Sequence, residues 1–376
     1  MELLPQQAGV PYAVKELKDL DSLITAHSTY QTRVLSKGSH SVPPRALVVH
    51  AYPHMGLGNR LPSIATGFVM ALFTGRILLV DATAVLQHID LPFPADWQQH
   101  KGLYSHLDCS PVVNCKDNVM YYCSKQGDNT TGLHLGNAEL LQYRSYDYDM
   151  PLLQINQQMA ALFDKFFSDG EVFNAVARHL FQPAAAVTAA MRPYLHQKHD
   201  CAVGLHMRRR KRYEGQQVQA EHFADIARML ARSSIGSIFL ASDADVFGRM
   251  QQLLGQQLWW SNLTSTSVVT HNTTAGNPGT ELSAFVDMFM LTKCEAIVVS
   301  PASSFGCVAA GIAGVRPVYA AFGAHEAPFV DPWFWQSITS EPCMYKAGKY
   351  HGFGGEMQAR LRAGYALYLY QTQCHH

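Results

Sequence analysis

The segment from residue 45 to residue 81 constrains the fold more than any other part of the sequence. Residues 45–51 (RALVVHA) form an apolar run typical of a buried strand, and residues 77–80 form a second one that ends at Asp81. Between them, residues 61–72 place apolar side chains at the i, i+3, i+4 spacing of a helix. A strand, a helix and a second strand in this order form a βαβ unit, so the sequence predicts an α/β fold with a parallel sheet.

A glycine-bearing turn joins the first of these strands to the helix, with the sequence His54-Met55-Gly56-Leu57-Gly58-Asn59-Arg60. Proteins of the α/β class bind anions at this point, because free N–H groups and the helix dipole face the ligand. Pro62 breaks the dinucleotide pattern G-x-G-x-x-G, and no G-K-[ST] follows as in a phosphate-binding Walker loop. A tight turn that merely requires two glycines explains the residues equally well, so both interpretations stay open.

A second α/β series occupies the later part of the chain. It comprises predicted strands at 202–207, 238–241 and 296–300, and predicted helices at 219–232, 244–254, 281–293 and after Ser303. Three helical patterns precede it, at 151–166, 171–181 and 183–198, and residues 82–150 are predicted to be rich in loops. We therefore expect two α/β domains, residues 1–190 and residues 191–376.

A basic run, His206-Met207-Arg208-Arg209-Arg210-Lys211-Arg212, ends the first strand of this second series. Active-site groups collect at the carboxyl ends of parallel strands, and strand alternation places His206 and Arg208 on the same face. Because a guanidinium offers a planar fork to phosphate, Arg208 is a candidate anion ligand. A solvated basic face or a nuclear-localisation segment is the alternative interpretation.

Two further segments carry weaker signals. Thr280 is expected to cap a helix that begins at Glu281, and Asp287 lies off the apolar stripe of that helix, where a surface position is the simplest interpretation. Ser303 is expected to cap the following helix, and a helix N-terminus at this place is also suited to an anion.

Composition excludes some classes of function. Lys plus Arg and Asp plus Glu both number 29, so the net charge argues against a protein that binds nucleic acid or a membrane surface through bulk charge. No run approaches the roughly 20 apolar residues that span a bilayer, and no signal peptide is visible. We therefore expect a soluble chain without membrane contact, or the lumenal part of a longer protein.

Cysteines and sequons favour the secretory pathway. Cys109, Cys115 and Cys123 are crowded without the spacing of a zinc site, so disulfides are expected. Sequons begin at Asn129, Asn262 and Asn272.

Two acidic pairs, Asp147-Tyr148-Asp149 and Asp243-Ala244-Asp245, match the D-x-D pattern of metal-dependent glycosyltransferases. The pattern is short enough to arise by chance, and acids at the entry of a helix need no metal. We expect no metal site at either pair.

Taken together, these segments resemble the plant xyloglucan-type α-1,2-fucosyltransferase family, within the fucosyltransferase superfamily. The resemblance is carried by residues 56–81, 203–208, 287–320 and 340–343. It implies a GT-B-like fold, in which two Rossmann-like domains face a cleft. The N-terminal domain would be the acceptor side, and the C-terminal domain would hold GDP-fucose.

The resemblance also implies roles for individual residues. Arg208 would bind the diphosphate and stabilise the leaving group, and His206 would lie against the nucleotide. Asp287 would accept hydrogen bonds from guanine, and Ser303, Ser304 and Phe305 would line the phosphate and the sugar. Gly58, Asn59 and Arg60 would approach the donor from across the cleft.

The second arginine of the basic run departs from the plant family. The H-x-R-R pattern is similar to that of α-1,6-fucosyltransferases and bacterial nodulation fucosyltransferases, so linkage and acceptor stay open. In the α-1,6 relatives a base occurs near the position of Glu214, which makes Glu214 the candidate catalytic base.

The function implied is inverting transfer of fucose from GDP-fucose to a hydroxyl of an oligosaccharide or polysaccharide in the Golgi lumen, through an α-1,2 linkage and without metal or cofactor. Two alternatives remain. One is a protein O-fucosyltransferase, and the other is a non-catalytic relative that binds GDP-sugars or glycans.

Overall fold

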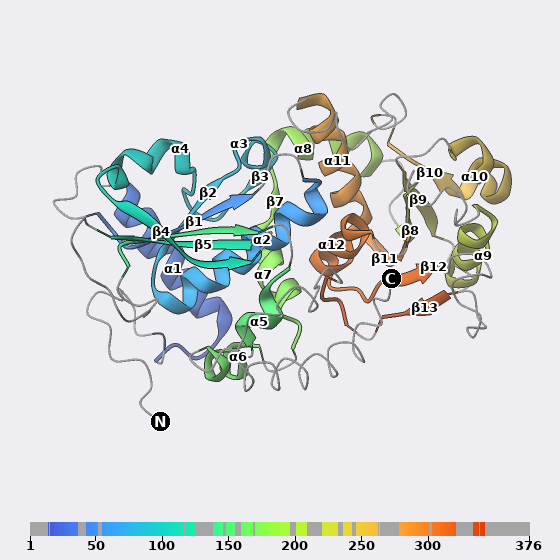
Figure 1. Cartoon of the computed structure of the whole chain (residues 1–376). Coiled ribbons are helices and arrows are strands. Elements are labelled where there is room, and N and C mark those ends of the chain that lie inside the picture. The colour runs from blue at the N-terminus through green and yellow to red at the C-terminus, as the bar shows by residue number, and fades with distance from the viewer. Residues whose placement is uncertain are drawn as a thin grey trace.

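The computed structural model describes the following parts of the chain: residues 14, 16–36, 43–51, 55–115, 118–124, 138–145, 148–154, 159–167, 170–195, 201–208, 220–231, 236–242, 246–261, 263, 278–300, 303–320, 334–337 and 339–342. Two α/β halves lie side by side, and helices of both halves fill the space between the two sheets (Figure 1). No helix among these residues has the length and apolar character needed to cross a lipid bilayer.

The N-terminal sheet has the strand order β2-β1-β6-β5-β4. Its strands are β1 (Ala46–Ala51), β2 (Ile77–Asp81), β4 (Asp108–Cys115), β5 (Asn118–Ser124) and β6 (Leu140–Ser145). β1 pairs in parallel with β2 and β6, which confirms the predicted βαβ unit. β5 pairs antiparallel with both β4 and β6, so the sheet is mixed.

The prediction that residues 82–150 are mainly loops is therefore wrong, because three strands of the sheet lie there. The sequences of β4 and β5 contain Asn, Asp, Ser and Cys and show no clear alternation. Pairing with an existing sheet supplies the strand environment that local propensity does not indicate.

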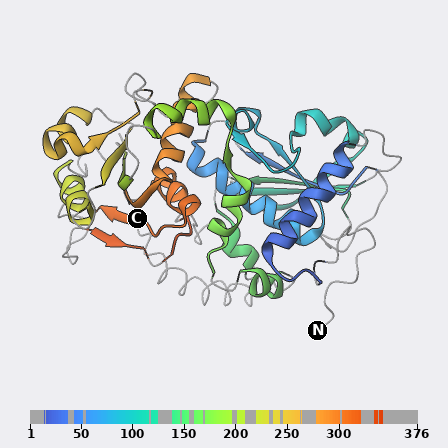
Figure 2. The ribbon, with the colours of Figure 1, turned by 180° about the vertical axis from the view of Figure 1, so that it is seen from behind.

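Helices and a small second sheet complete the N-terminal half. They are α1 (Leu20–Ser36), α2 (Leu57–Thr74), α3 (Thr83–Leu86), β3 (Ile89–Asp90), α4 (Trp97–His100), η1 (Lys101–Tyr104), α5 (Met150–Gln154), α6 (Ala160–Phe166), α7 (Val172–Leu180), β7 (Gln182–Pro183) and α8 (Ala185–Leu195). The view from behind shows α1 and α2 running across the sheet (Figure 2). The helical patterns predicted at 171–181 and 183–198 are confirmed by α7 and α8.

Helix α2 is the central element of this half. Every residue in it is buried except Asn59, because it lies between the sheet and helices α7 and α12. Gly67 allows the close approach to the sheet, since a Cβ there would lie 2.2 Å from Cγ2 of Val49. Gly75 ends the helix in the left-handed conformation, with φ 61°.

The C-terminal sheet has the order β10-β9-β8-β11-β12-β13, and all pairs are parallel except β12–β13. Its elements are β8 (Cys201–Met207), α9 (Ala220–Ala231), β9 (Ser237–Ser242), α10 (Phe247–Leu254), η3 (Gly255–Gln257), β10 (Leu258–Trp259), α11 (Pro278–Leu291), β11 (Cys294–Val299), α12 (Ser304–Ala313), β12 (Val318–Ala320) and β13 (Phe334–Gln336). The predicted strands and helices of this half are confirmed where they are described. Thr280 lies inside α11, which begins at Pro278, so its predicted capping position is wrong.

A disulfide joins Cys201 to Cys294 at the beginnings of the neighbouring strands β8 and β11. This pair lies at the opposite end of the strands from His206 and Ser300. The disulfide expectation is thus confirmed for one pair. Cys109, Cys115 and Cys123 lie on β4 and β5, but their side chains are outside the described residues, as are the sequons at Asn129, Asn262 and Asn272.

The two halves are joined by buried polar contacts at α7 as well as by apolar packing. The carboxylate of Glu341 accepts hydrogen bonds from the hydroxyl of Tyr148 and, at 2.6 Å, from the backbone N–H of Phe173 in the first turn of α7. Glu171 in turn accepts from the backbone N–H of Ser340 at 2.9 Å. The predicted domain boundary between residues 190 and 191 stays a prediction.

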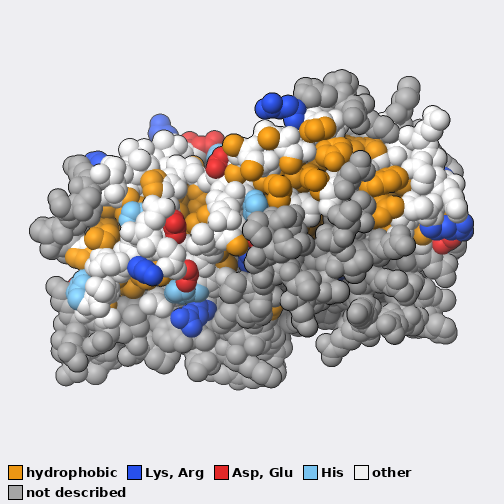
Figure 3. All heavy atoms as spheres, turned by 90° about the horizontal axis from the view of Figure 1, so that it is seen from above, with side chains coloured by type: hydrophobic (Ala, Val, Ile, Leu, Met, Phe, Trp, Pro, Cys, Tyr) orange, Lys and Arg blue, Asp and Glu red, His pale blue; other side chains and the backbone are white. Residues whose placement is uncertain are grey.

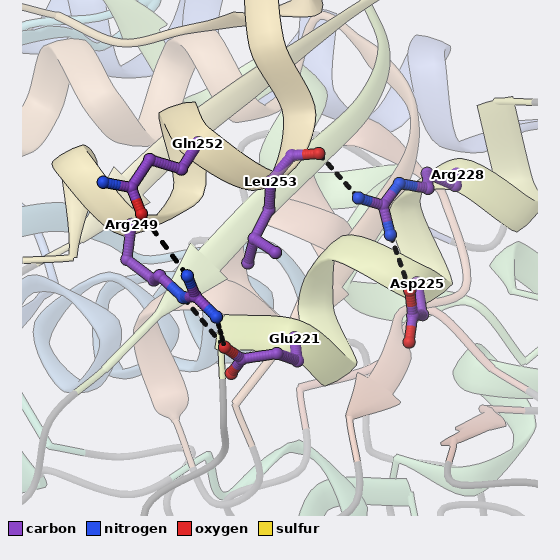
Figure 4. Close-up of polar contacts among 6 residues, drawn as sticks. All are labelled: Glu221, Asp225, Arg228, Arg249, Gln252 and Leu253. Carbon is purple, nitrogen blue, oxygen red and sulfur yellow. Dashed lines mark hydrogen bonds and ion pairs between the residues drawn. The ribbon is translucent and has the colours of Figure 1, made fainter.

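Charged side chains are scattered over the surface. On the face seen from above, acidic and basic groups alternate with uncharged ones, and hydrophobic side chains gather over the C-terminal half (Figure 3). An exposed ion pair joins two neighbouring helices of this half, since Arg249 of α10 binds Glu221 of α9 at 2.5 Å (Figure 4). Exposed pairs of this kind contribute at most about 1 kcal/mol to stability.

Candidate functional site

The candidate site lies where the first turn of α2 meets the first turn of α12. Gly56 precedes α2 and accepts from the backbone N–H groups of Asn59 and Arg60, so the predicted turn residues 58–60 belong to the helix itself. Gly58 has no room for a side chain, because a Cβ there would lie 2.4 Å from the backbone N of Phe305 and 2.7 Å from Oγ of Ser304. The N-terminal ends of both helices, which carry the positive ends of the helix dipoles, therefore lie in the same region.

A direct hydrogen bond fixes this junction. The Ser304 hydroxyl donates to Oδ1 of Asn59 at 2.8 Å, across 245 residues of sequence. Both side chains are part-buried. The junction thus brings together Gly58, Asn59 and Ser304, which the sequence assigned to one site.

Arg60 is placed differently from the expectation that it reaches toward a diphosphate. Its Nη2 binds Oε1 of Glu281 in α11 at 2.9 Å, and both side chains are only 3% exposed. The predicted diphosphate contact of Arg60 stays a prediction, but the guanidinium has a buried carboxylate as its partner. Sequence reasoning used Glu281 only as the start of a helix.

His206 forms a neutral platform beside the junction. It is 6% exposed, its Nδ1 lies 3.2 Å from the Ser303 hydroxyl, and its ring stacks on Phe305 with centroids 4.9 Å apart. Burial, reinforced by the charge of Arg208, lowers the pKa of His206 to about 3. The imidazole is therefore uncharged at neutral pH and can present only one N–H donor.

Ser303 precedes α12 in the N-cap position, but its side chain makes no capping hydrogen bond. The predicted side-chain cap is wrong, because the hydroxyl is engaged with His206 instead. Glycine at position 306 permits this packing, since a Cβ there would lie 2.9 Å from Nδ1 of His206.

Arg208 follows the last residue of β8 and is half-buried. Its backbone N–H donates to Oγ of Ser300 at 2.9 Å, and Ser300 follows the neighbouring strand β11. The basic residue therefore stands at the carboxyl edge of the sheet, as predicted. Arg209 to Arg212 and Glu214 are outside the described residues.

Asp287 is buried in α11 and is only 3% exposed, so the interpretation of this residue as a surface position is wrong. The helix lies between the sheet and α8, and both sides of it are covered. The Ser261 hydroxyl donates to Oδ1 of Asp287 at 2.5 Å. Ser261 is fully buried and was not identified from the sequence, where a single serine after a short strand carries no signal.

Asp149 of the first acidic pair is also buried. It accepts hydrogen bonds from the hydroxyls of Tyr143, at 2.5 Å, and Ser145, at 2.7 Å. Asp147, Asp243 and Asp245 are outside the described residues. Among the residues that are described, no three His, Cys, Asp or Glu side chains come together in a way that could hold a metal ion.

The close contact at Gly58 yields a test with a matched control. We expect Gly58→Ala to destabilise the protein by about 1–3 kcal/mol, because the added methyl group must push the first turns of α2 and α12 apart. Gly56→Ala should change stability by less than about 1 kcal/mol, since a Cβ there meets nothing within 4 Å and the backbone has φ −66°. Denaturant unfolding of both variants measures the difference, and equal losses would contradict the described contact.

The chain is similar in sequence and in fold to known fucosyltransferases. The family model described as "Xyloglucan fucosyltransferase" matches residues 268–352, which include α11 and α12. Among curated proteins of Arabidopsis thaliana, "Probable fucosyltransferase 9" is 23% identical over 332 residues, covering 78% of this chain and 66% of its own length. "Probable fucosyltransferase 7" is 25% identical and "Galactoside 2-alpha-L-fucosyltransferase" 23%, each covering 77% of this chain and respectively 65% and 62% of their own length.

The chain thus spans less than two thirds of the length of these three relatives. A solved structure of a mutant of Arabidopsis thaliana FUT1 in complex with GDP superposes with a TM-score of 0.55 at 19% identity, covering 84% of this chain and 79% of that one. This likeness confirms the GT-B-like fold. The family model and the curated relatives confirm that the resemblance carried by the motifs is to the xyloglucan-type fucosyltransferases.

Proposed function

We propose that this protein transfers fucose from GDP-fucose to a hydroxyl group of a glycan, with inversion at the anomeric carbon and formation of an α-1,2 linkage. The observation that carries the proposal is the junction of two helix N-termini, from different halves of the chain, beside the strand β8, which is followed directly by Arg208. The names of the curated relatives and the GDP complex of the structural neighbour support the donor.

The junction is suited to a diphosphate. The N-termini of α2 and α12 supply partial positive charge. Arg208 adds a full charge at the carboxyl edge of the C-terminal sheet, directly after β8, and Ser303 follows the neighbouring strand β11. We propose that His206 and Phe305 form an uncharged surface beside the phosphates and that Asp287 accepts hydrogen bonds from guanine.

In the reaction, the acceptor oxygen forms a bond to C1 of fucose while the bond from C1 to the β-phosphate oxygen breaks. The electron pair of the broken bond leaves with GDP, so negative charge grows on the diphosphate in the transition state. Arg208 would stabilise that charge more strongly than it stabilises the bound donor, which is the requirement for catalysis. The acceptor hydroxyl loses its proton, and Glu214 remains the candidate base.

The acceptor is an oligosaccharide or polysaccharide, and the site of action is the Golgi lumen. The disulfide between Cys201 and Cys294 supports an oxidising compartment. Labelled GDP-fucose with an array of glycan and peptide acceptors tests the proposal. Transfer to peptides alone would favour a protein O-fucosyltransferase, and GDP binding without transfer to any acceptor would favour a non-catalytic relative.

Arg208→Ala should reduce transfer by a few hundred-fold, which corresponds to about 3–4 kcal/mol of transition-state stabilisation. The reason is the loss of a charge-assisted contact to the leaving group. Initial rates with labelled GDP-fucose measure the effect, and circular dichroism checks the fold.

Arg249→Ala is the matched control, because that arginine lies on the surface in an ion pair with Glu221. It should retain wild-type turnover. A folded Arg208→Ala protein with near-normal turnover would remove Arg208 from the proposed mechanism.

Asp287→Ala should weaken GDP binding by about 10- to 150-fold, since hydrogen bonds to a charged group contribute about 1.5–3 kcal/mol. Binding of inorganic diphosphate should scarcely change, because the carboxylate would contact the base and not the phosphates. Calorimetry with both ligands measures the difference.

Ser261→Ala is the companion variant, since it removes the hydroxyl that donates to Asp287 and leaves the carboxylate in place. Equal losses for GDP and diphosphate would mean that Asp287 only supports its helix.

We also propose that transfer requires no divalent metal. Arg208 and the N-termini of α2 and α12 would supply the positive potential around the diphosphate. Initial rates should be unchanged in excess EDTA and should not rise when Mn²⁺ is restored. Activity that vanishes in EDTA, returns with Mn²⁺ and is absent from Asp243→Asn and Asp245→Asn variants would overturn this proposal.

A further inference from the structure

The ion pair between Arg60 and Glu281 is enclosed at the boundary between the two halves. It joins α2 to α11 over 221 positions of sequence, at 2.9 Å, with both side chains 3% exposed. A charge buried to this degree is stable only with a partner, since removing it from water is expensive. Each of the two charges is therefore held in place by the other.

The surroundings of the pair keep it in this position. Nε of Arg60 is buried and has no hydrogen-bond partner among the described residues, and the same holds for both ring nitrogens of His88. The ring of His88 lies against Phe285 of α11, with centroids 5.1 Å apart. Burial is the main cause that lowers the pKa of His88, so this neighbour stays neutral and does not compete for the Glu281 carboxylate. Glu281 is thus the anionic partner that the described residues offer to Arg60.

Arg60 is also part of the site by its position in the chain. Gly58 touches the backbone of residues 304 and 305, Asn59 accepts from Ser304, and Arg60 binds Glu281. Three consecutive residues in one helical turn are therefore each fixed by the C-terminal half. Asn59 and Gly58 lie in the candidate donor site, whereas the Arg60 side chain points into the buried boundary.

We infer that Glu281 is a positioning residue: its ion pair with Arg60 holds the first turn of α2 against α12, so that Asn59 is aligned with a donor bound by the C-terminal half. The inference rests on the proposed fucosyl transfer. It replaces the expectation that Arg60 supplies its charge to the diphosphate. Arg60 acts through the backbone of its own turn, and the charge near the leaving group comes from Arg208.

This role has a kinetic signature. Most of the proposed contacts to GDP, from Asp287, Arg208 and the start of α12, belong to the C-terminal half, and only the N-terminus of α2 comes from the other half. Loss of the clamp should therefore affect GDP binding much less than it affects transfer. Transfer requires the two halves to be correctly positioned relative to each other around the donor. A misplacement of about 1 Å can lower a rate by about 100-fold. A direct phosphate ligand would show the opposite pattern, in which GDP binding itself is lost.

Three variants test the inference: Glu281→Gln, Arg60→Met and the combination of both. We expect each single variant to lower kcat by about 100-fold, while the Kd for GDP stays within about three-fold of the wild type. We expect the double variant to be no worse than Arg60→Met, because the two side chains act as one unit. Calorimetry measures the Kd, and transfer to the acceptor found in the array measures kcat.

Glu221→Gln is the matched control. It makes the same chemical change at an exposed ion pair, with Arg249, whose side chains are 42% and 55% exposed. This variant should keep wild-type kcat and Kd. The comparison separates the effect of the buried clamp from that of losing a carboxylate.

Two outcomes would overturn the inference. Arg60→Met could weaken GDP binding more than ten-fold while Glu281→Gln leaves it unchanged or tightens it, which would identify Arg60 as a phosphate ligand. Alternatively, all variants could lose stability and keep their kcat, which would reduce the pair to a structural role.

Failure of the proposed function can be told apart from failure of the clamp. If the wild type transfers no fucose, the clamp is tested by unfolding of Glu281→Gln, Ser304→Ala and the double variant. Non-additive changes in the unfolding midpoint would support coupling between the ion pair and the Asn59–Ser304 contact. Strictly additive changes would overturn it.

Discussion

The close approach of two helix N-termini is the constraint on which the rest of this structure depends. Gly58 lets the first turn of α2 touch the backbone at the start of α12, and no other residue type fits without moving one of the helices. The N-terminus of a helix carries partial positive charge, so the approach of two such ends concentrates that charge in one place. Two partial positive charges repel each other, and an anion bound at the junction would offset that repulsion. The packing and the proposed diphosphate site therefore have one origin.

Buried polar contacts hold the two halves at this separation. Arg60 with Glu281 secures α2 against α11, and Glu341 secures the segment after β13 against the first turn of α7. A buried polar group without a partner costs more free energy than the paired group contributes to stability. These contacts therefore favour the one relative position of the halves in which every such group is paired. Apolar packing of α12 against α2 and α7 supplies the area of contact.

Two neighbouring residues of the C-terminal half, His206 and Arg208, differ in charge. His206 is kept neutral by burial and stacks on Phe305, while Arg208, two residues later in the chain, carries a full positive charge. Ser300 ties the two strand ends together by accepting from the backbone of Arg208. In the proposed reaction, a cation beside an uncharged surface would stabilise the leaving diphosphate.

The sequence by itself determined the βαβ unit, most of the strands and helices of the second half, and the positions of Gly58, Asn59, His206 and Arg208, because periodicity and turn residues act locally along the chain. Only the tertiary structure decided that β4 and β5 are strands, that Asp287 is buried, and that the Ser303 hydroxyl faces His206 instead of capping α12. The partnership of Arg60 with Glu281 spans 221 positions and leaves no local pattern. Burial and pairing depend on which surfaces meet after folding, and that information is distributed over the whole chain.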